Sequence, residues 1–485
     1  MGLGGINVAT EYPEISKDDL QKSLDKLKAR FLNGSFPDYN ERVDRITRLK
    51  NLVEENSDSF HKALQDDFGT RHEQLSLLSD TMPVIGTAKH TLKNLKKWMK
   101  PEKRKPNFPL GLLGAKAFIQ HQPYGVVGII SPWNFPLNLS LAPLVEIFAA
   151  GNNAMMKLSE FVPATSNLTE ELIKKYFTDD EAIVINGGPQ TSQSFSGLAF
   201  DHLLFTGSTQ VAKKIASEAS TNLVPLTLEL GGKSPVVIGP KAKMKKSVDK
   251  IMMGKLLNAG QICVAPDYVF VPENKEKEFI DHANEYVKES YPTLKNNPDY
   301  TSVIHLNHYE RLKGYIDDAK SKGAKIVELN PAHEDLSQQE NHKIAPTIIM
   351  NPTEDMDVMK NEIFGPILPV ISYKDLNETI TYINQKPKAL ALYYFGDDEV
   401  EINKLLNKTS SGQMVINDVV WQFGMSDLPF GGVGPSGSGA CHGHDGFLNF
   451  SHNRAVLRQQ NILNAGKLIG APYSEKTEKN IKNFG

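Results

Sequence analysis

The stretch HLLFTGSTQVAKKIASEA, residues 202–219, decides the fold class. A short apolar run is followed by a turn with glycine and then by a segment whose apolar residues recur at helical spacing. A strand, a tight turn and a helix in this order form the repeating unit of a parallel sheet covered by helices. The start of the helix also predicts an anion site at Gly207 and Ser208, because its free backbone N–H groups attract phosphate. A turn in which the glycine only permits tight packing is the alternative.

Similar apolar runs lie on both sides of this unit and form two series. The first series also contains GVVGII (125–130), NAMMK (153–157), AIVI (182–185) and PLTLEL (225–230). The second contains PVVI (235–238), YVFV (268–271), PTIIM (346–350), LALYYF (390–395) and QMVIN (413–417). Helical stretches separate the runs, so we predict two α/β domains with doubly wound parallel sheets and a boundary near residue 231.

The flanking segments follow other patterns. From Ser16 to about Lys100 apolar residues recur at steps of three and four, which predicts helices, and Ser16 with Asp19 resembles a capping box. A Pro- and Lys-rich break at 100–111 ends this layer. The alternation of AFIQHQ (117–122) indicates an edge strand or an arm.

Composition excludes several classes of protein. The 485 residues contain 54 Lys+Arg and 57 Asp+Glu, so the chain lacks the positive charge that a nucleic acid partner requires. The two cysteines, Cys263 and Cys441, allow one disulfide at most, which fits a reducing compartment. The first residues lack the pattern of a secretory signal, and no segment reaches the roughly 18 apolar residues of a membrane helix. We therefore expect a cytoplasmic protein with no membrane partner.

Three residues stand out as candidates for chemistry. Cys263 lies between a helical stretch and a strand, where it is either a nucleophile or an inert buried thiol. Glu229 is a carboxylate inside an apolar strand, and burial would raise its pKa until it can accept a proton from water; an exposed edge face is the alternative. Asn134, between prolines in SPWNFPLNL (131–139), is either a rigid donor to an oxyanion or an ordinary turn residue.

Three further patterns imitate known sites but fail in context. FGGVGPSG (430–437) matches G-x-G-x-x-G, yet no helix-forming run follows it, so we expect a glycine-rich loop. GGKS (231–234) lacks the earlier glycine of a phosphate-binding loop, since Thr227 occupies that position. A third group lacks the usual spacing of metal ligands, so we expect a surface or interface loop and no metal. Its members are Cys441, His442, His444 and His452.

Together these segments resemble the aldehyde dehydrogenase superfamily from about residue 20 to residue 460. The resemblance is carried by SPWNFPLNL, KLSE (157–160), FTGST (205–209), LELGGKSP (228–235), NAGQICVAPDY (258–268), EIFGPILPV (362–370) and PFGGVGPSGSG (429–439). The motif CVAPDY and the ending GACHGHDGFLNFSHNRAV are similar to the class-three branch, close to bacterial coniferyl aldehyde dehydrogenases.

The resemblance implies an aldehyde-dehydrogenase-like fold of two doubly wound parallel-sheet domains and a small oligomerisation arm. Residues 1–231 would hold the N-terminal helices and a Rossmann-like NAD-binding domain, with an arm strand near 113–123. Residues 232–418 would form the catalytic domain that carries the cysteine. Residues 419–485 would form a return segment, an oligomerisation strand and the C-terminal tail. A homodimer is implied.

The implied reaction is the NAD(P)-dependent oxidation of an aldehyde to a carboxylic acid. Cys263 would attack the aldehyde carbon as a thiolate, and Asn134 with the backbone N–H of Cys263 would stabilise the oxyanion. Loss of hydride would leave a thioester, which Glu229 would hydrolyse by activating water. Relatives that transfer the acyl group to coenzyme A generally lack this base. A coenzyme A-acylating enzyme and a catalytically silent protein of the same fold are the alternatives.

The resemblance also assigns residues to the coenzyme. Lys157 and Glu160 would contact the adenosine ribose, Gly207 and Ser208 the pyrophosphate, and Glu362 the nicotinamide ribose. A carboxylate near the 2'-hydroxyl would repel a 2'-phosphate, so we expect NAD, with NADP also possible. The expected cofactor-binding residues are Trp133, Lys157, Ser159, Glu160, Gly207, Ser208, Ala212, Glu362, Phe364 and Phe430.

Local differences from the family concern a turn, a helix and the substrate pocket. Leu158 stands where a proline is common, which is expected to loosen that turn, while Ala212 replaces a glycine and is small enough to keep its helix close. Phe135, Trp421 and Phe423 would line an apolar tunnel for aromatic or medium-chain aldehydes. Alternatively, the last two are core or dimer contacts.

Overall fold

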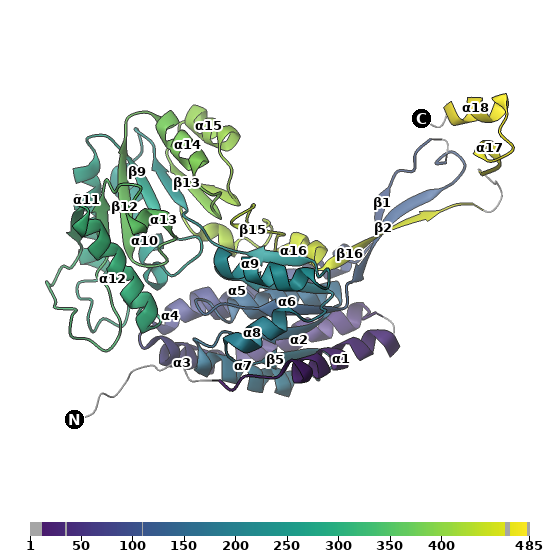
Figure 1. Ribbon diagram of the computed structural model, residues 1–485, viewed down its shortest axis with the longest axis horizontal. Helices are drawn as coiled ribbons and strands as arrows, with labels where there is room; N and C mark the ends of the chain where they lie inside the picture. The colour runs from purple at the N-terminus through teal and green to yellow at the C-terminus, as the bar shows by residue number, and fades with distance from the viewer. Residues whose placement is uncertain (1–11, 34–35, 109, 461–465, 483–485) are drawn as a thin grey trace.

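Two large sheets form the centre of the molecule (Figure 1). The computed structural model describes residues 12–33, 36–108, 110–460 and 466–482, so the expected domain limits at 1 and 485 fall outside the described residues. The first sheet has the order β15-β7-β6-β3-β4-β5, and the second has the order β10-β11-β12-β9-β8-β13-β14. A small third sheet, β1-β2-β16, stands apart from both.

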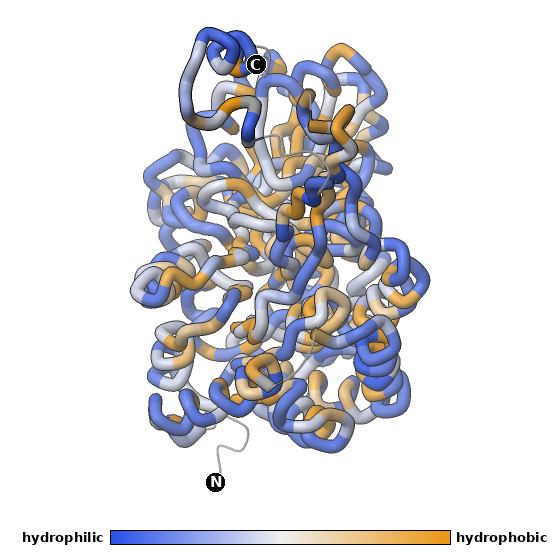
Figure 2. The backbone as a smooth tube through the Cα atoms, turned by 90° about the vertical axis from the view of Figure 1, so that its right-hand side faces the viewer, coloured by the Kyte–Doolittle hydropathy of each residue, from blue (hydrophilic) through white to orange (hydrophobic). Residues whose placement is uncertain are grey.

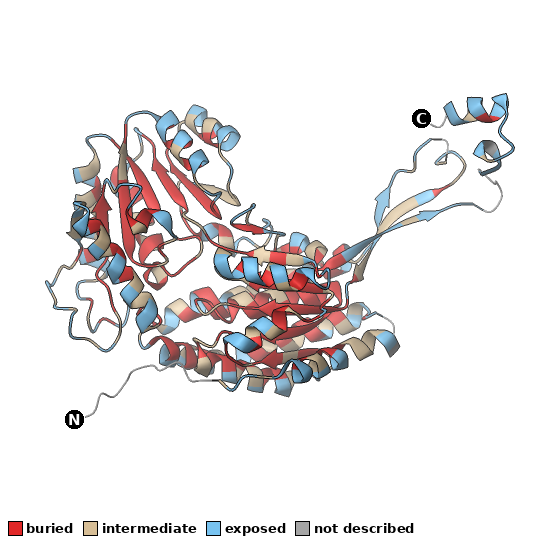
Figure 3. Cartoon of the chain, viewed as in Figure 1, coloured by how far each residue is buried: buried red, intermediate tan, exposed pale blue. Residues whose placement is uncertain are grey.

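The first sheet is parallel except at one edge, where β15 is antiparallel to β7. Its strands are β3 (Val126–Ile130), β4 (Asn153–Lys157), β5 (Ala182–Ile185), β6 (His202–Thr206), β7 (Leu226–Glu229) and β15 (Gly437–Ser438). The helices between them are α6 (Asn138–Ala150), α7 (Pro163–Tyr176), α8 (Pro189–Ser196) and α9 (Thr209–Ser220). β3 and β4 are buried along their whole length, as expected for strands with helices on both faces (Figure 3).

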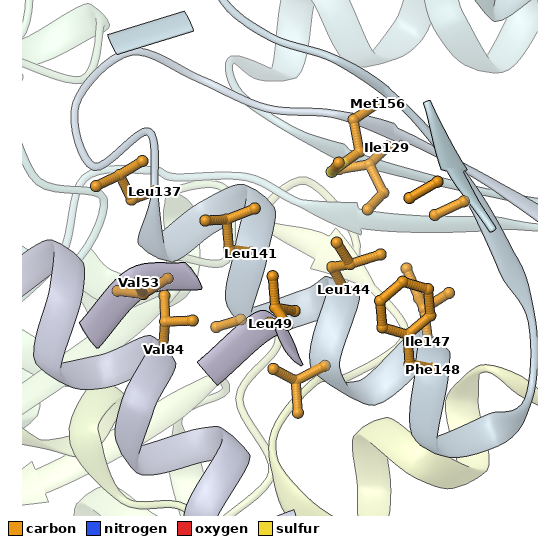
Figure 4. Close-up of a cluster of buried hydrophobic side chains, with 14 of the residues drawn as sticks. Leu49, Val53, Val84, Ile129, Leu137, Leu141, Leu144, Ile147, Phe148 and Met156 are labelled. Atoms are coloured by element: carbon orange, nitrogen blue, oxygen red, sulfur yellow. The ribbon is translucent and has the colours of Figure 1, made fainter. Parts of the chain in front are cut away.

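The N-terminal helices lie on both faces of this sheet. They are α1 (Lys17–Asn33), α2 (Tyr39–Glu55), α3 (Ser57–Phe68), α4 (Glu73–Ser76), the π-helical turn η1 (Leu77–Thr81) and α5 (Met82–Trp98). α1 packs on the face that carries α8 and α9, and α2, α3 and α5 lie on the face that carries α6 and α7. The backbone N–H of Asp19 donates to Ser16 Oγ at 3.2 Å, so the predicted cap at the start of α1 is present. Figure 4 shows side chains of α2, α5, α6, β3 and β4 packed into one apolar cluster. Burial of this cluster fixes α6 against the sheet.

The second sheet contains strands that the sequence predicts and two that it does not. Its strands are β8 (Pro235–Ile238), β9 (Tyr268–Pro272), β10 (Lys325–Glu328), β11 (Thr347–Met350), β12 (Ile367–Tyr373), β13 (Ala391–Phe395) and β14 (Gln413–Ile416). β10 is short and half-exposed at an antiparallel edge, and β12 contains Pro369, so neither matches the pattern of a buried parallel strand. The helices around this sheet are α10 (Met244–Leu256), α11 (Glu276–Ser290), α12 (Leu306–Ser321), α13 (Asp357–Lys360), α14 (Leu376–Gln385) and α15 (Glu399–Lys408). The apolar segments of both sheets gather inside the molecule (Figure 2).

The third sheet is an arm that projects from the first sheet and is mostly exposed (Figures 1 and 3). It consists of β1 (Glu102–Arg104), β2 (Lys116–Pro123) and β16 (Ser451–Arg458). β2 lies between the other two strands, so AFIQHQ belongs to an arm, and its interpretation as an edge strand is wrong. α17 (Gly466–Ile469) and α18 (Glu475–Lys482) follow at the end of the arm. None of the helices within the described ranges has the length and apolar character needed to cross a membrane.

Candidate active site

A cavity lies between the end of β7, helix α6 and the loop that carries Cys263. It encloses about 1170 Å³ outside protein atoms, including the part open to solvent. Cys263 and Glu229 both line this active-site cavity, together with Phe135, Trp421 and Phe423. The structure therefore places the predicted nucleophile, the predicted base and the predicted substrate residues around one space.

The loop that carries Cys263 is held in an unusual backbone conformation. It follows the turn η2 (Leu257–Gly260), in which Asn258 and Ala259 have φ angles of 49° and 51°. Left-handed backbone at residues other than glycine is strained and persists where the surroundings impose it. Gln261 imposes it here, because its Nε2 donates to the carbonyls of Asn258 at 2.9 Å and Ser302 at 3.0 Å. The strained turn delivers Cys263 to the cavity.

The environment of Cys263 favours the neutral thiol. Burial, followed by the charges of Glu362 and Glu229, raises its pKa to about 12. Protein groups alone therefore keep the sulfur protonated at neutral pH. Attack on a carbonyl requires that a base remove this proton or that a positive charge approach the sulfur.

Glu229 ends the strand β7 and is fixed through its backbone on both sides. Its carbonyl accepts a hydrogen bond from the N–H of Gly207 at 3.0 Å, and Gly437 of β15 lies opposite it. Gly437 has a φ of 148° and a Cβ there would collide with the carbonyl of Leu228, so only glycine permits this pairing. FGGVGPSG is thus a loop that supports Glu229. The next helix along the chain is α16 (Gly443–Asn449), so no helix starts directly at this loop.

The side chain of Glu229 is buried, with 6% of the residue exposed. Neither carboxylate oxygen has a hydrogen-bond partner within the part of the chain that the structure describes. Burial first, and then the charge of Glu146, raises its pKa well above the usual value. The alternative of an exposed edge face is therefore wrong, and the carboxylate is suited to accept a proton from water.

Asn134 is buried beside the cysteine loop but is not among the residues that line the cavity. Its Nδ2 donates to the carbonyl of Gln261 at 3.1 Å, two residues before Cys263. An amide nitrogen carries two hydrogens, so the second remains for an oxyanion on the sulfur-bound carbon. The hydrogen bond places Asn134 against the Cys263 loop.

A buried ion pair that the sequence reasoning missed holds the Asn134 turn. Arg71 donates through Nη1 to the carbonyl of Asn134 at 2.8 Å and through Nη2 to Asp80. Asp80 lies in the π-helical turn η1 and accepts the N–H of Leu137 at 3.1 Å. Both side chains are fully buried. An arginine and an aspartate within a helical layer carry no sequence signal of this role, because 63 positions separate Arg71 from Asn134.

The residues expected to bind the coenzyme fit a dinucleotide. Glu362 is half-buried, and its Oε1 is shielded from solvent without a hydrogen-bond partner among the described residues. Burial with the charge of Asp267 raises its pKa to about 8 despite a hydrogen bond from Gly232. An unpartnered carboxylate oxygen of this kind suits a ribose hydroxyl. Lys157 is buried at the end of β4, and its Nζ lies 3.6 Å from Glu160.

The turn before α9 has the backbone geometry that the predicted anion site at Gly207 and Ser208 requires. Ser208 caps the helix by accepting the N–H of Val211 at 3.4 Å. A Cβ at Gly207 would collide with the ring of Phe205, so the turn needs glycine. Ala212 is buried on α9, which keeps the helix close to the sheet.

The remaining cofactor candidates lie in three places. Trp133 and Phe364 meet edge to face with ring centroids 5.4 Å apart, whereas Phe430 lines the active-site cavity. Ser159 accepts the N–H of Phe161 at 3.3 Å. Leu158, in the turn before it, is buried, and its N–H donates to the carbonyl of Ile185 at 3.4 Å.

The cysteine and histidine group does not form a surface loop throughout. Cys441 is buried and lines the active-site cavity, as does His442, so that expectation is wrong for these two residues. His444 packs against Trp98 with ring centroids 5.8 Å apart. Within the part of the chain that the structure describes, no three His, Cys, Asp or Glu side chains are arranged to hold a metal ion. Both thiols are free.

Comparison with known proteins agrees with this geometry. Residues 6–456 match the model of the aldehyde dehydrogenase family. The chain belongs to this family. It is 49% identical to a probable coniferyl aldehyde dehydrogenase of Caulobacter vibrioides, over 98% of each chain. It is 44% identical to a coniferyl aldehyde dehydrogenase of Pseudomonas sp., over 98% of this chain and 96% of the other.

A solved structure shows the same fold. The substrate-bound state of Staphylococcus aureus AldH superposes with a TM-score of 0.89 at 34% identity, covering 96% of this chain and 99% of the other. The α/β fold, the family and the enzyme class expected from the sequence are confirmed. The aldehyde dehydrogenase oxidises a small-molecule aldehyde and uses NAD(P) as the electron acceptor.

Proposed function

We propose that this aldehyde dehydrogenase oxidises an aromatic aldehyde of the coniferyl aldehyde type, or a medium-chain aliphatic aldehyde, with Cys263, Asn134 and Glu229 as its catalytic residues. The observation that carries this proposal is a thiol and an unpaired carboxylate that line one largely apolar cavity. The substrate class is supported by the two relatives, a probable coniferyl aldehyde dehydrogenase of Caulobacter vibrioides and a coniferyl aldehyde dehydrogenase of Pseudomonas sp..

The first step is addition of the Cys263 sulfur to the aldehyde carbon. A carbon–sulfur bond forms, the carbonyl π electrons move to oxygen, and the thiol proton leaves to a base. Asn134 Nδ2 and the backbone N–H of Cys263 would donate to the oxygen of the resulting thiohemiacetal. Loss of one such donor typically costs about 3–4 kcal/mol of transition-state stabilisation.

The coenzyme would lie along the carboxyl end of the first sheet. When bound, its nicotinamide ring accepts the hydride that leaves the thiohemiacetal carbon. Glu362 would hold the nicotinamide ribose, Gly207 and Ser208 the pyrophosphate, and Lys157 with Glu160 the adenosine ribose. The Glu160 carboxylate would repel a 2'-phosphate, so we propose that NAD is preferred and that NADP is accepted less well.

Release of the product falls to Glu229. Its carboxylate takes a proton from water, the water oxygen bonds to the acyl carbon, and the carbon–sulfur bond breaks to free the acid and the Cys263 thiolate. A buried base without other partners is available for this proton transfer. Hydrolysis is therefore proposed over transfer to coenzyme A.

The mouth of the cavity indicates how the aldehyde enters. Leu78 and Trp421 line the cavity and are 49% and 48% exposed, respectively, so the cavity opens between them. Phe135 and Phe423 lie further in and are more deeply buried. Aromatic walls suit a planar apolar substrate.

The nucleophile is tested by Cys263→Ala. We expect reduction of NAD with coniferaldehyde or benzaldehyde to fall below detection while coenzyme binding, measured by fluorescence titration, is retained. Cys441→Ala removes the other thiol of the cavity and should keep most of the turnover. Near-normal turnover of the Cys263 variant contradicts the assignment, as does iodoacetamide labelling that does not prefer Cys263 over Cys441.

The fate of the acyl group is tested by Glu229→Gln. We expect a burst of reduced coenzyme followed by very slow turnover, because acylation proceeds and hydrolysis lacks its base. In the unmodified enzyme the product should be the free acid, even with coenzyme A present. Accumulation of an acyl-coenzyme A thioester would support the alternative activity.

We also propose that the enzyme is a cytoplasmic homodimer. The arm supports a dimer, because its strand β16 lies at a sheet edge and is largely exposed along its length. The two free thiols fit a reducing compartment. Analytical ultracentrifugation of the whole chain tests the dimer, and a monomer at micromolar concentration would contradict it.

A further inference from the structure

A second carboxylate that the catalytic proposal does not use lies in the active-site cavity. Glu146 is in the middle of α6, a helix that packs between the sheet and the N-terminal helices. The residue is only 2% exposed and lines the cavity together with Glu229 and Cys441. A glutamate so deeply buried in an apolar helix needs a physical reason, because ionised carboxylates are expensive to bury.

The immediate contacts of Glu146 satisfy only part of its carboxylate. Oε1 accepts the backbone N–H of His442 at 2.9 Å, and the N–H of Gly443 also donates to the group. Oε2 is buried and has no hydrogen-bond partner among the residues that the structure describes. A Cβ at Gly446 would collide with this carboxylate, so a glycine on α16 makes room for it. The structure thus holds Glu146 by two backbone donors and leaves one oxygen unused.

The electrostatic surroundings couple Glu146 to Glu229. Burial raises the pKa of Glu146 to about 8, although the two backbone donors oppose the rise. The charge of Glu146 is in turn the second cause, after burial, of the raised pKa of Glu229. Two carboxylates so placed in a cavity with few polar neighbours favour a state in which one of them is protonated. The other charged and titratable groups around them are Cys263, Cys441, His442, Asp445, His90 beside Gly443, and Arg42 and Arg45 toward the far end of α6.

We propose that Glu146 is the proton-transfer partner of Glu229 and receives the proton that Glu229 removes from water during thioester hydrolysis. The proposal rests on the proposed role of Glu229 as the base. The O–H bond of water breaks as its oxygen bonds to the acyl carbon, and the proton moves to Glu229. No hydrogen bond joins the two carboxylates within the described residues, so the proton passes from Glu229 through water in the shared cavity to the unpartnered oxygen of Glu146. Glu229 thereby regains its basic form, and Glu146 releases the proton to solvent before the next turnover.

A purely structural role for Glu146 makes a different prediction. The hydrogen bond from His442 ties α6 to the segment before α16, and a glutamine at position 146 can accept it equally well. If this tie were the only function, Glu146→Gln would behave like the unmodified enzyme. Replacing the carboxylate with a neutral amide therefore distinguishes a purely structural role of Glu146 from a role in proton transfer.

The test uses hydrolysis of 4-nitrophenyl acetate by the whole enzyme without coenzyme. The burst of 4-nitrophenolate measures acylation of Cys263, and the steady rate that follows measures hydrolysis of the thioester. Both are measured between pH 5 and pH 10 for the unmodified chain, Glu146→Gln and Asp445→Asn. The last variant removes an exposed carboxylate near Glu146 and is the matched control.

We expect Glu146→Gln to keep the burst and to lower the plateau of the steady rate on the order of tenfold, because Glu229 loses its proton acceptor. The rising limb of the steady rate should move to lower pH by about one unit, since a negative charge next to Glu229 is gone. Asp445→Asn should resemble the unmodified chain in both respects. An unmoved rising limb overturns the proposal, whatever the plateau, and so does a plateau within twofold of the original.

Glu229→Gln distinguishes failure of this proposal from failure of the proposed function. If its steady rate is normal, Glu229 is not the base, and both proposals fall. If Glu229→Gln stops hydrolysis while Glu146→Gln leaves both plateau and rising limb unchanged, only the proton-transfer role of Glu146 falls.

Discussion

The contact between α2 and the first sheet and the active-site cavity each bury a glutamate to the same extent, but the two residues differ in their partners and in the direction of their pKa shifts. Glu181, before β5, and Glu229, at the end of β7, are both 6% exposed. Glu181 accepts two hydrogen bonds from Arg48, at 2.8 and 3.0 Å, and lies 3.3 Å from Arg45. Glu229 has no hydrogen-bond partner for either carboxylate oxygen.

The pKa values of the two carboxyls shift in opposite directions. Burial acts against the ionised form of both, but hydrogen bonds from Arg48 and the nearby charges lower the pKa of Glu181 to about 2. At Glu229 burial and the charge of Glu146 act together and raise the pKa. Burial alone therefore does not decide whether a carboxyl is ionised at neutral pH. The presence or absence of a neighbouring arginine decides it. Glu146 and Glu362 each have an unpartnered oxygen as well, so unpaired carboxylates gather around the active site.

Replacement of Arg71 by methionine breaks this contrast, because it leaves a paired carboxylate of the helical layer unpaired. Asp80 would stay buried without its cation, and loss of one partner of a buried pair costs about 3–5 kcal/mol. We expect the free energy of unfolding in urea to fall by about this amount. Turnover should also fall, because the carbonyl of Asn134 loses its donor.

The double variant Arg71→Met, Asp80→Asn is the control for the Arg71 prediction. It removes the charge that would otherwise be stranded, so it should recover part of the lost stability. If the single variant loses less than about 1 kcal/mol, the pair does not stabilise the fold as the geometry indicates.

Replacing Glu181 or Glu229 with glutamine sharpens the comparison, because the two replacements should change the free energy of unfolding in opposite directions. The pKa of Glu181 is lowered from 4.5 to about 2, so its stabilisation is present above about pH 4.5 and is lost as the pH falls toward 2. Glu181→Gln should therefore lower the free energy of unfolding at pH 7 by about 3 kcal/mol. The raised pKa of Glu229 makes that residue destabilising as the pH rises above 4.5, so Glu229→Gln should raise stability at pH 7.

Urea denaturation at pH 7 and pH 4 measures both effects. The difference between each variant and the unmodified chain should shrink at pH 4, where the carboxyls of the unfolded chain are largely protonated. If both variants change the free energy of unfolding in the same direction at pH 7, a buried carboxylate with an arginine partner and one without do not differ in stability as we expect.

Local sequence patterns sufficed to predict most of the two large sheets. Each apolar run marked as a strand forms one, because strands buried on both faces need continuous apolar residues. Glu229 could be recognised for the same reason, as a charge where the pattern demands an apolar residue. β12 was missed because Pro369 interrupts its pattern, although the strand is mostly buried.

The parts of the site that depend on distant contacts could not be predicted in the same way. Arg71 acts on Asn134 from 63 positions away, and the segment that binds Glu146 lies 296 positions further along the chain. Whether a charge on a helix faces solvent, a partner or a cavity depends on which elements pack against that helix. The contacts of Arg71 depend on how η1 packs against the start of α6, and those of Glu146 on how α16 packs against α6.

The smallest effect is expected for a substitution at the rim of the cavity. It extends the comparison from charged to apolar side chains. Trp421 lines the cavity at its mouth and is 48% exposed, so we expect it to add contact area for a bound substrate at a distance from the reacting groups. Trp421→Ala should raise KM for coniferaldehyde several-fold, equivalent to about 1 kcal/mol, and leave kcat and the KM for NAD unchanged. Leu428→Ala is the control, since Leu428 is 55% exposed on the same loop and does not line the cavity. A fall in kcat with an unchanged KM would mean that Trp421 shapes the reacting centre, in which case the rim and the buried floor of the cavity act as one unit.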